Sequence, residues 1–189
     1  MRIYYADIRG LDESSALYPP LSDGPGSAFG TSLLAAAYKN YVGGKLPSLL
    51  KTALGRPFFP KEPELSFSIS HSKTHVLVAL STSPLGADTE AHREINPDLI
   101  SRLASPKELE GLSFFDIWVL RESLYKLTNE GDLRSLRFYA QNGKITPPIP
   151  GVHCRLYPDI ENSSTAVCSY TDDFPDKLVK LPGELLVND

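Results

Sequence analysis

Hydrophobic and polar positions alternate with a period of two in several short segments of the chain. The clearest case is residues 65–70, where Leu65, Phe67 and Ile69 are separated by polar residues. Because successive side chains of a strand point to opposite faces, this pattern predicts a strand with one buried face. We expect it to form an antiparallel meander with two strands that follow it. Strands are predicted in total at residues 2–8, 65–70, 74–82, 85–90, 134–140, 152–157, 164–170 and 178–181.

Apolar residues spaced by three or four positions predict the helices. In residues 113–129 the apolar side chains of Ile117, Leu120, Leu124 and Leu127 fall on one narrow stripe, which is typical of a helix packed on a core. Other helices are predicted at residues 28–42 and, as two short pieces, within residues 97–112, the second of them beginning at Ser105 and Pro106.

The order of these elements indicates how the chain is organised. Helices followed by about three strands occur twice, and the polar stretch 91–96 before Pro97 separates the two sets. We therefore expect an α+β fold with two halves, residues 1–92 and 93–189. A turn is expected at residues 23–26, and the segment after Pro182 is expected to be poorly ordered.

Composition excludes several classes of protein. The 189 residues carry a net charge of −4, without the basic surplus that a nucleic-acid-binding protein needs. The sequence contains no run of about 20 apolar residues that could cross a membrane, and the N-terminus lacks the apolar region of a signal peptide. The two cysteines, Cys154 and Cys168, are expected to be reduced, buried thiols. We expect a cytoplasmic monomer.

Two acidic residues near the middle of the chain are the first candidate for chemistry. Asp88 and Glu90 are two positions apart in a predicted strand, so both carboxylates point to the same face. Two neighbouring carboxylates repel each other, and a hard cation such as Mg²⁺ bound between them removes that repulsion. The alternative is two solvated acids at the end of a hairpin.

One face of the helix at 113–129 is a second candidate. Trp118, Glu122 and Lys126 form a stripe opposite the core, which by itself is typical of a solvated face with an ion pair. However, Phe115 and Tyr125 flank the same side, and exposed aromatic residues favour a cleft or an interface.

Together these residues predict a site for a phosphate-rich ligand. Glu122 could be a third metal ligand beside the two acids of the strand, and no P-loop or dinucleotide-binding motif is present. The ordinary alternative for Arg56 and Lys126 is a surface cation, and for His71 it is a histidine bonded to the backbone. The donors suited to phosphate oxygens are Arg56, Ser70, His71, Ser72 and Lys126.

In this order and combination the motifs resemble those of the 4′-phosphopantetheinyl transferases of the surfactin-synthetase-activating type, including the short bacterial holo-acyl-carrier-protein synthases. The resemblance covers about residues 55–130. It is carried by Gly-Arg-Pro at 55–57, Phe-Ser-Ile-Ser-His-Ser at 67–72, Gly-Ala-Asp-Thr-Glu at 86–90 and Trp-Val-Leu-Arg-Glu-Ser-Leu-Tyr-Lys at 118–126.

The resemblance implies an enzyme that transfers the phosphopantetheine arm of coenzyme A to a serine of an apo-acyl or peptidyl carrier protein, with Mg²⁺ as cofactor and release of 3′,5′-ADP. It implies two similar halves related by a pseudo-twofold axis, with the active site in the cleft between them. By matching position it implies that Asp88, Glu90 and Glu122 bind the metal, that Glu122 and Lys126 are catalytic, and that Arg56, Pro57, Ser70 and His71 contact coenzyme A.

One departure from the family pattern leaves alternatives open. The family usually carries basic residues in its first long helix to hold the coenzyme A 3′-phosphate, whereas here no cation occurs in residues 26–34. That contact would then come from Lys39, Lys45 or His71. A relative that binds coenzyme A or a carrier protein without turnover is the second hypothesis, and an unrelated Mg²⁺-dependent phosphohydrolase is the third.

Overall fold

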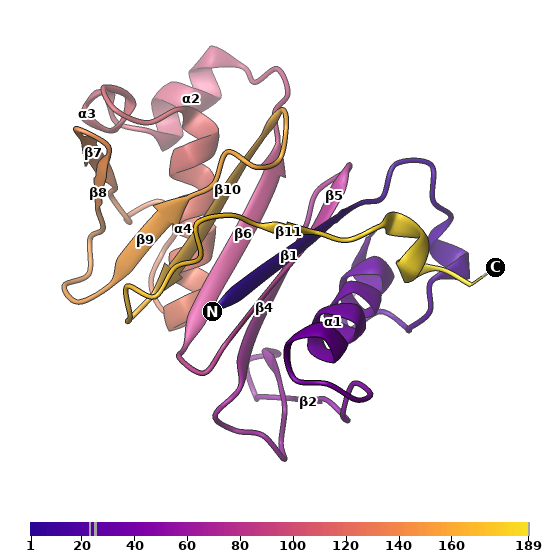
Figure 1. Cartoon of the computed structure of the whole chain (residues 1–189). Coiled ribbons are helices and arrows are strands. Elements are labelled where there is room, and N and C mark those ends of the chain that lie inside the picture. The colour runs from indigo at the N-terminus through magenta and orange to yellow at the C-terminus, as the bar shows by residue number, and fades with distance from the viewer. Residues whose placement is uncertain (23, 25, 189) are drawn as a thin grey trace.

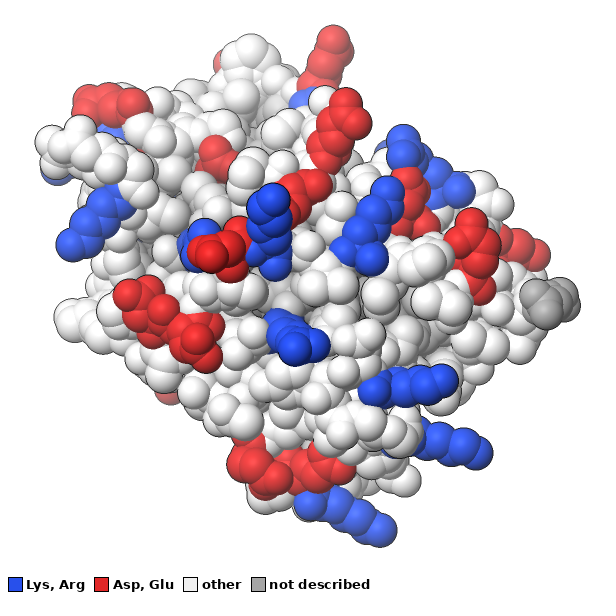
Figure 2. Space-filling model, in the orientation of Figure 1, with Lys and Arg blue, Asp and Glu red and all other residues white. Residues whose placement is uncertain are grey.

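The computed structural model describes residues 1–22, 24 and 26–188 and shows an α+β fold (Figure 1). Asp23 and Pro25 of the turn predicted at residues 23–26 lie outside the described residues. In that part of the chain, no helix is both long and apolar enough to cross a bilayer. Acidic and basic side chains are interspersed over the face of the molecule shown in Figure 2.

A first sheet contains the N-terminal strand and both strands of a hairpin. Its order is β11 (Val179–Lys180), β1 (Arg2–Asp7), β5 (His75–Ser81) and β4 (Ser66–His71). β5 is antiparallel to both β1 and β4, whereas β11 runs parallel to β1. α1 (Ser27–Tyr41) packs on one face of this sheet, and its buried residues form a core with those of β1, β4 and β5.

A second sheet has the order β6 (Leu85–Ala91), β10 (Ser163–Ser169) and β9 (His153–Leu156), all antiparallel. α4 (Phe114–Thr128) packs on it. The predicted three-stranded meander is therefore wrong in its last step. Both edges of β5 are already occupied, by β1 and β4, so β6 follows β5 in the chain but pairs with β10 instead.

The two sheets pack against each other through a shared core, on the faces that the helices do not cover. Ile3 and Leu77 of the first sheet pack with Ala87 and Val167 of the second. α1 and α4 thus lie on the outer faces, as Figure 1 shows. This layering brings β4 alongside β6, and the candidate site lies at that junction.

The remaining elements are short. Residues 134–140 were predicted as one strand, but strand structure is limited to Tyr139–Gln141. The preceding residues form a turn at Asp132 to Ser135, and the Phe138 amide donates to Glu108 instead of to a ladder. The short elements are η1 (Glu13–Ser15), β2 (Leu50–Lys51), β3 (Pro57–Phe58), α2 (Pro97–Leu103), α3 (Pro106–Leu109), β7 (Tyr139–Gln141), β8 (Lys144–Thr146) and η2 (Gly183–Leu186).

The C-terminal segment is more ordered than its sequence predicts. After β11 it forms η2, and the side chain of Leu186 is fully buried in the core beneath α1. The Leu17 amide donates to the Leu186 carbonyl, which ties the tail to the N-terminal region. Figure 1 shows this segment, in yellow, returning beside the indigo β1. The expectation of a poorly ordered tail was wrong because Leu186 and Val187 pack on the core and backbone contacts tie the segment to residues 15–17.

Candidate functional site

The site depends on an unusually close approach of α4 to β6. A Cβ atom built on Gly86 would lie 2.5 Å from the Leu127 amide nitrogen and closer still to the Ser123 carbonyl oxygen, so only glycine fits there. Alternation along β6 places the side chains of Asp88 and Glu90 on the same face as this glycine. Both carboxylates therefore face the side of the strand on which α4 packs. The sequence predicted that they share a face, and the structure shows which face it is.

Asp88 is held by groups from two different elements. Ser70 on β4 donates from its Oγ to Asp88 Oδ1 at 2.6 Å, and Lys126 on α4 donates from Nζ to the same oxygen at 2.7 Å. The carboxylate is buried, whereas the lysine side chain is 28% exposed. Ser70 Oγ also accepts from the Thr89 amide, and Lys126 Nζ donates to the Ala87 carbonyl, which fixes both partners to β6.

Glu122 lies one helical turn from Lys126 on the same face of α4 and is half-buried. Burial raises the pKa of its carboxyl, and the negative charges of Asp88 and Glu90 raise it further, while the positive charge of Lys126 acts in the opposite direction. Asp88 and Glu90 therefore lie close enough to Glu122 to disfavour its ionised form. A cation bound among them would relieve that repulsion.

The residues at this site suit a metal ion in their chemistry but not in their arrangement. Carboxylate oxygens are the ligands that Mg²⁺ prefers, and three of them surround this corner of the molecule. However, within the described residues no three His, Cys, Asp or Glu side chains converge closely enough to hold a metal ion. Lys126 pairs with Asp88, and Arg93 pairs with Glu90 at 3.1 Å, so basic side chains balance two of the three acids in this structure.

Beside the carboxylates is a pocket of about 280 Å³. It is bounded by α1, by the loop before β3, by β4 and by the last turn of α4. Three of the four residues predicted to contact coenzyme A line this pocket, and so does Lys126. The fourth, Ser70, is not among the lining residues and bonds to Asp88 instead. The lining residues used below are Ser27, Arg56, Pro57, His71, Tyr125 and Lys126.

Arg56 connects this pocket to the end of α4. Its Nη1 donates to the Leu127 carbonyl at 3.3 Å and its Nη2 to the Leu85 carbonyl at 3.1 Å. Burial lowers the pKa of the guanidinium, which nevertheless remains charged at neutral pH. Arg56 thus fixes the Gly-Arg-Pro turn against both β6 and α4, a role that its sequence motif did not indicate.

The sequence also did not reveal a buried ion pair behind the site. Arg121 Nη2 donates to Glu108 Oε1 at 2.8 Å, and both side chains are almost fully buried. Burial would raise the pKa of Glu108, but hydrogen bonds from Ser105, Arg121 and the Phe138 amide outweigh it and lower the pKa. The pair, together with the bond from Arg121 Nη1 to the Leu103 carbonyl, ties α4 to α2 and α3. The capping box at Ser105 and Glu108 was the available signal.

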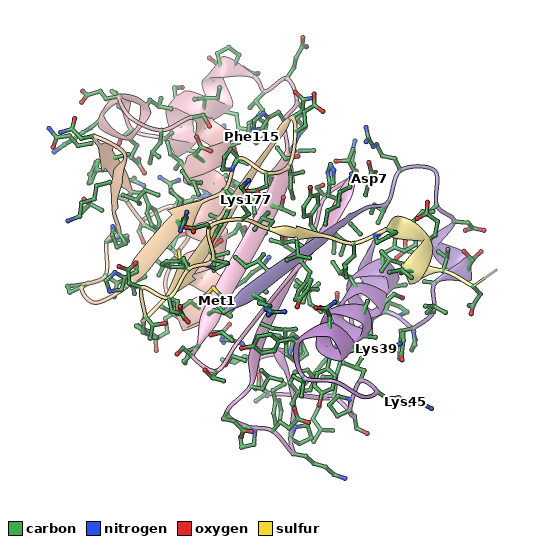
Figure 3. All side chains as sticks on the ribbon, in the orientation of Figure 1. Met1, Asp7, Lys39, Lys45, Phe115 and Lys177 are labelled. Atoms are coloured by element: carbon green, nitrogen blue, oxygen red, sulfur yellow. The ribbon has the colours of Figure 1, made fainter. Side chains whose placement is uncertain are left out.

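A second unpredicted contact lies at the start of α1. Glu13 accepts from the Gly26 and Ala28 amides at 2.8 and 3.1 Å, so a carboxylate from η1 already occupies the N-terminus of the helix. Of the three predicted candidates for a phosphate contact, His71 lines the pocket. Lys39 and Lys45 lie near the other end of α1 (Figure 3), and Lys39 is about 18 Å along the helix axis from Ser27.

Comparison with known proteins gives a consistent result. No family model matches the chain. A 4′-phosphopantetheinyl transferase of Bacillus subtilis is 30% identical over 152 residues, which cover 70% of this chain and 67% of the relative. The 4′-phosphopantetheinyl transferase Sfp of Bacillus subtilis strain 168 is 28% identical over the same shares of both chains.

A third relative is the 4′-phosphopantetheinyl transferase gsp of Aneurinibacillus migulanus, 31% identical over 91 residues, which cover 43% of this chain and 38% of the relative. The identity and coverage of the first relative show the family. The chain therefore belongs to the 4′-phosphopantetheinyl transferases, as its four ordered motifs predicted.

Proposed function

We propose that this protein transfers the 4′-phosphopantetheine arm of coenzyme A to a serine hydroxyl of an apo-acyl or peptidyl carrier protein and releases 3′,5′-ADP. The observation that carries the proposal is that Lys126 bonds to Asp88 beside the pocket lined by Arg56 and His71, with Glu122 near enough to both for their charges to act on its pKa. Acids for a metal, cations for phosphates and an adjoining pocket are the parts that such a transfer requires.

In this mechanism Asp88, Glu90 and Glu122 would hold Mg²⁺. When bound, the metal supplies positive charge to the pyrophosphate and to the leaving phosphate. Ser70 keeps the Asp88 carboxylate in place through its 2.6 Å hydrogen bond. Lys126, whose amine is partly exposed beside the pocket, provides a cation for the phosphate oxygens. Glu122, or a water that it orients, would take the proton of the carrier serine.

The pocket would hold the nucleotide end of coenzyme A. Arg56 and Pro57 form its wall on the side of the Gly-Arg-Pro turn, where an adenine ring would lie. His71 is the candidate for the 3′-phosphate, because the carboxylate of Glu13 already satisfies the N-terminus of α1 and would repel a second anion there. Ser70 would act through Asp88 in addition to any contact with the substrate.

We further propose that residues 1–92 and 93–189 form two similar halves about a pseudo-twofold axis, with the carrier protein bound across the cleft between them. The support is that each half contributes one long helix, α1 or α4, and each helix packs on the outer face of a different sheet. The halves also exchange strands, because β6 of the first half lies in the sheet under α4 and β11 of the second half lies in the sheet under α1. The pocket also takes its lining from both halves, for example from His71 and Tyr125. A complete site in one chain makes a monomer sufficient.

The test is to incubate the protein with coenzyme A, Mg²⁺ and a panel of apo-carrier proteins and to weigh the carriers by intact mass spectrometry. We expect a gain of one phosphopantetheine with the wild type. The gain should be lost when EDTA removes the metal, return with added Mg²⁺, and be absent with Asp88→Asn.

Two results would contradict the proposal in different ways. Binding of coenzyme A by calorimetry without modification of any carrier would favour the non-catalytic relative. Release of inorganic phosphate from coenzyme A without a carrier protein would favour the phosphohydrolase, and transfer that continues unchanged in EDTA would remove the metal from the mechanism.

Replacing His71 with alanine should raise the KM for coenzyme A by about tenfold with little change in kcat, because one charge-assisted contact to the substrate is lost. Steady-state kinetics with a fixed carrier protein measure both constants. The matched control is His153→Ala, which changes an exposed histidine on β9 and should leave both constants unaltered. An equal KM for the His71 variant and the wild type would move the phosphate contact elsewhere.

A further inference from the structure

The two cysteines lie directly opposite each other on neighbouring strands outside the pocket. Cys154 on β9 is the register partner of Cys168 on β10. Their sulfur atoms are 2.6 Å apart, and both residues are free thiols in this structure. This pairing is independent of the proposed transferase site, because it involves neither the carboxylates nor the residues that line the pocket.

The ladder between β9 and β10 shows which kind of pair this is. The Tyr157 amide donates to the Thr165 carbonyl, so these two opposed residues are a hydrogen-bonded pair. Because hydrogen-bonded and non-hydrogen-bonded pairs alternate along antiparallel strands, Cys154 and Cys168, three positions away, form a non-hydrogen-bonded pair. The Cα atoms of such a pair lie about 4.5 Å apart, within the range that a disulfide can bridge.

The two thiols differ in their access to solvent. Cys168 is fully buried and contacts the Leu120 carbonyl of α4, with its Sγ at 3.8 Å from that oxygen. Cys154 is half-buried, which corrects the expectation that both thiols are buried, and it lines an open groove beside the β7–β8 hairpin. An oxidant can therefore reach one sulfur, and the second sulfur lies next to it, held by the sheet.

We propose that Cys154 and Cys168 are a redox modification site: a peroxide or a small disulfide oxidises them reversibly to an intramolecular disulfide between β9 and β10. With hydrogen peroxide, the Cys154 thiolate attacks one oxygen and the O–O bond breaks, which gives a sulfenic acid and a hydroxide ion. The hydroxide takes up the proton that the thiol released and leaves as the first water. Cys168 sulfur then attacks the sulfenic sulfur, the S–S bond forms and a second water leaves. The two thiols lose two electrons and two protons, and the peroxide takes up both. With a small disulfide, Cys154 forms a mixed disulfide and releases one small thiol, and attack by Cys168 then forms the S–S bond and releases the second.

Burial supports this order of events. It raises the pKa of the Cys168 thiol, and its contact with Cys154 raises it further, so Cys168 is the poorer thiolate and acts as the resolving partner. The disulfide would close a loop that contains the β9–β10 turn and would tie β9 to the strand on which α4 packs. We expect it to stabilise the second sheet without changing the pocket.

The experiment treats the full-length protein with stoichiometric hydrogen peroxide or oxidised glutathione, and then uses non-reducing digestion and mass spectrometry. We expect one crosslinked peptide that joins Cys154 to Cys168, a mass lower by the two thiol hydrogens, and a melting temperature higher by roughly 5–10 °C that returns on addition of dithiothreitol. Cys154→Ser should give neither the crosslink nor the shift. This variant changes the accessible cysteine and leaves the buried Cys168 in place, so the core is not altered.

Three outcomes would overturn the proposal. The first is that both thiols stay free in denaturing thiol titration after treatment. The second is a disulfide that joins two protein molecules instead of β9 and β10 of one molecule. The third is that the melting temperature of the wild type rises no more than that of Cys154→Ser.

Discussion

Replacement of Glu122 with glutamine is expected to slow phosphopantetheine transfer by about 10³-fold while making the metal-free protein more stable at neutral pH. The loss of activity follows because a neutral amide can neither take the proton of the carrier serine nor contribute charge for a metal. The gain in stability, about 1 kcal/mol or less, follows because the ionised carboxylate is disfavoured first by burial and then by Asp88 and Glu90.

The sign of the pH dependence follows from the direction of the shift. The pKa of Glu122 is raised above its ordinary value of 4.5, so the folded state binds its proton more tightly than the unfolded state does. The stability that Glu122 contributes is complete below that ordinary value and is lost as the pH rises through the raised pKa. Glu122→Gln should therefore be more stable than the wild type above this window and similar to it below.

Urea unfolding of both proteins in EDTA at several pH values measures this difference, and the carrier mass assay measures transfer. The control is Glu130→Gln, an exposed glutamate just beyond α4, which should change neither property. Transfer by Glu122→Gln within tenfold of the wild-type rate would remove Glu122 from the catalytic step. A variant that is less stable at neutral pH would show that the carboxylate is held by favourable contacts instead of being strained.

The sequence predicted the site's residue types better than their contacts. Alternation in β6 correctly placed Asp88 and Glu90 on one face, and helical spacing correctly placed Glu122 and Lys126 together on α4, because both patterns depend on local geometry alone. The hydrogen bonds from Ser70 and Lys126 to Asp88 cross between three elements. Such contacts depend on how the sheets pack, which no local pattern encodes.

The same distinction explains the errors in the fold. The hairpin of β4 and β5 was predicted correctly, since its strands are adjacent in the sequence. The partner of β6 was not, since it depends on which edges of β5 are already occupied by strands distant in the chain. The order of the C-terminal segment depends on the packing of Leu186 and Val187 and on backbone contacts to residues 15–17, and so short an apolar stretch leaves no periodic signal.

Gly86 shows how one residue connects the fold to the site. Its lack of a side chain lets the Ser123 carbonyl and the Leu127 amide of α4 contact β6 directly, and Ser123 Oγ donates to the Ala166 carbonyl of β10 at 2.9 Å. Small residues on both sides of the contact therefore set the distance between helix and sheet. That distance in turn allows Lys126 to reach Asp88.

Gly86→Ala should consequently destabilise the protein by about 3 kcal/mol and reduce transfer by at least about 10²-fold, because the added methyl group meets backbone atoms that cannot rotate away. α4 must shift outward, and Lys126 and Glu122 shift with it. Urea unfolding gives the stability, and the mass assay, performed at urea concentrations far below the unfolding midpoint, gives the activity of the folded fraction.

The control is Gly143→Ala, in the open turn between β7 and β8. Its added methyl group meets no other atom and should cost only about 1 kcal/mol through the positive φ of this residue, with transfer unchanged. If Gly86→Ala kept wild-type transfer, close packing of α4 on β6 would not be what aligns the carboxylates with the lysine. If both variants lost transfer equally, the loss would reflect general destabilisation and not the geometry at β6.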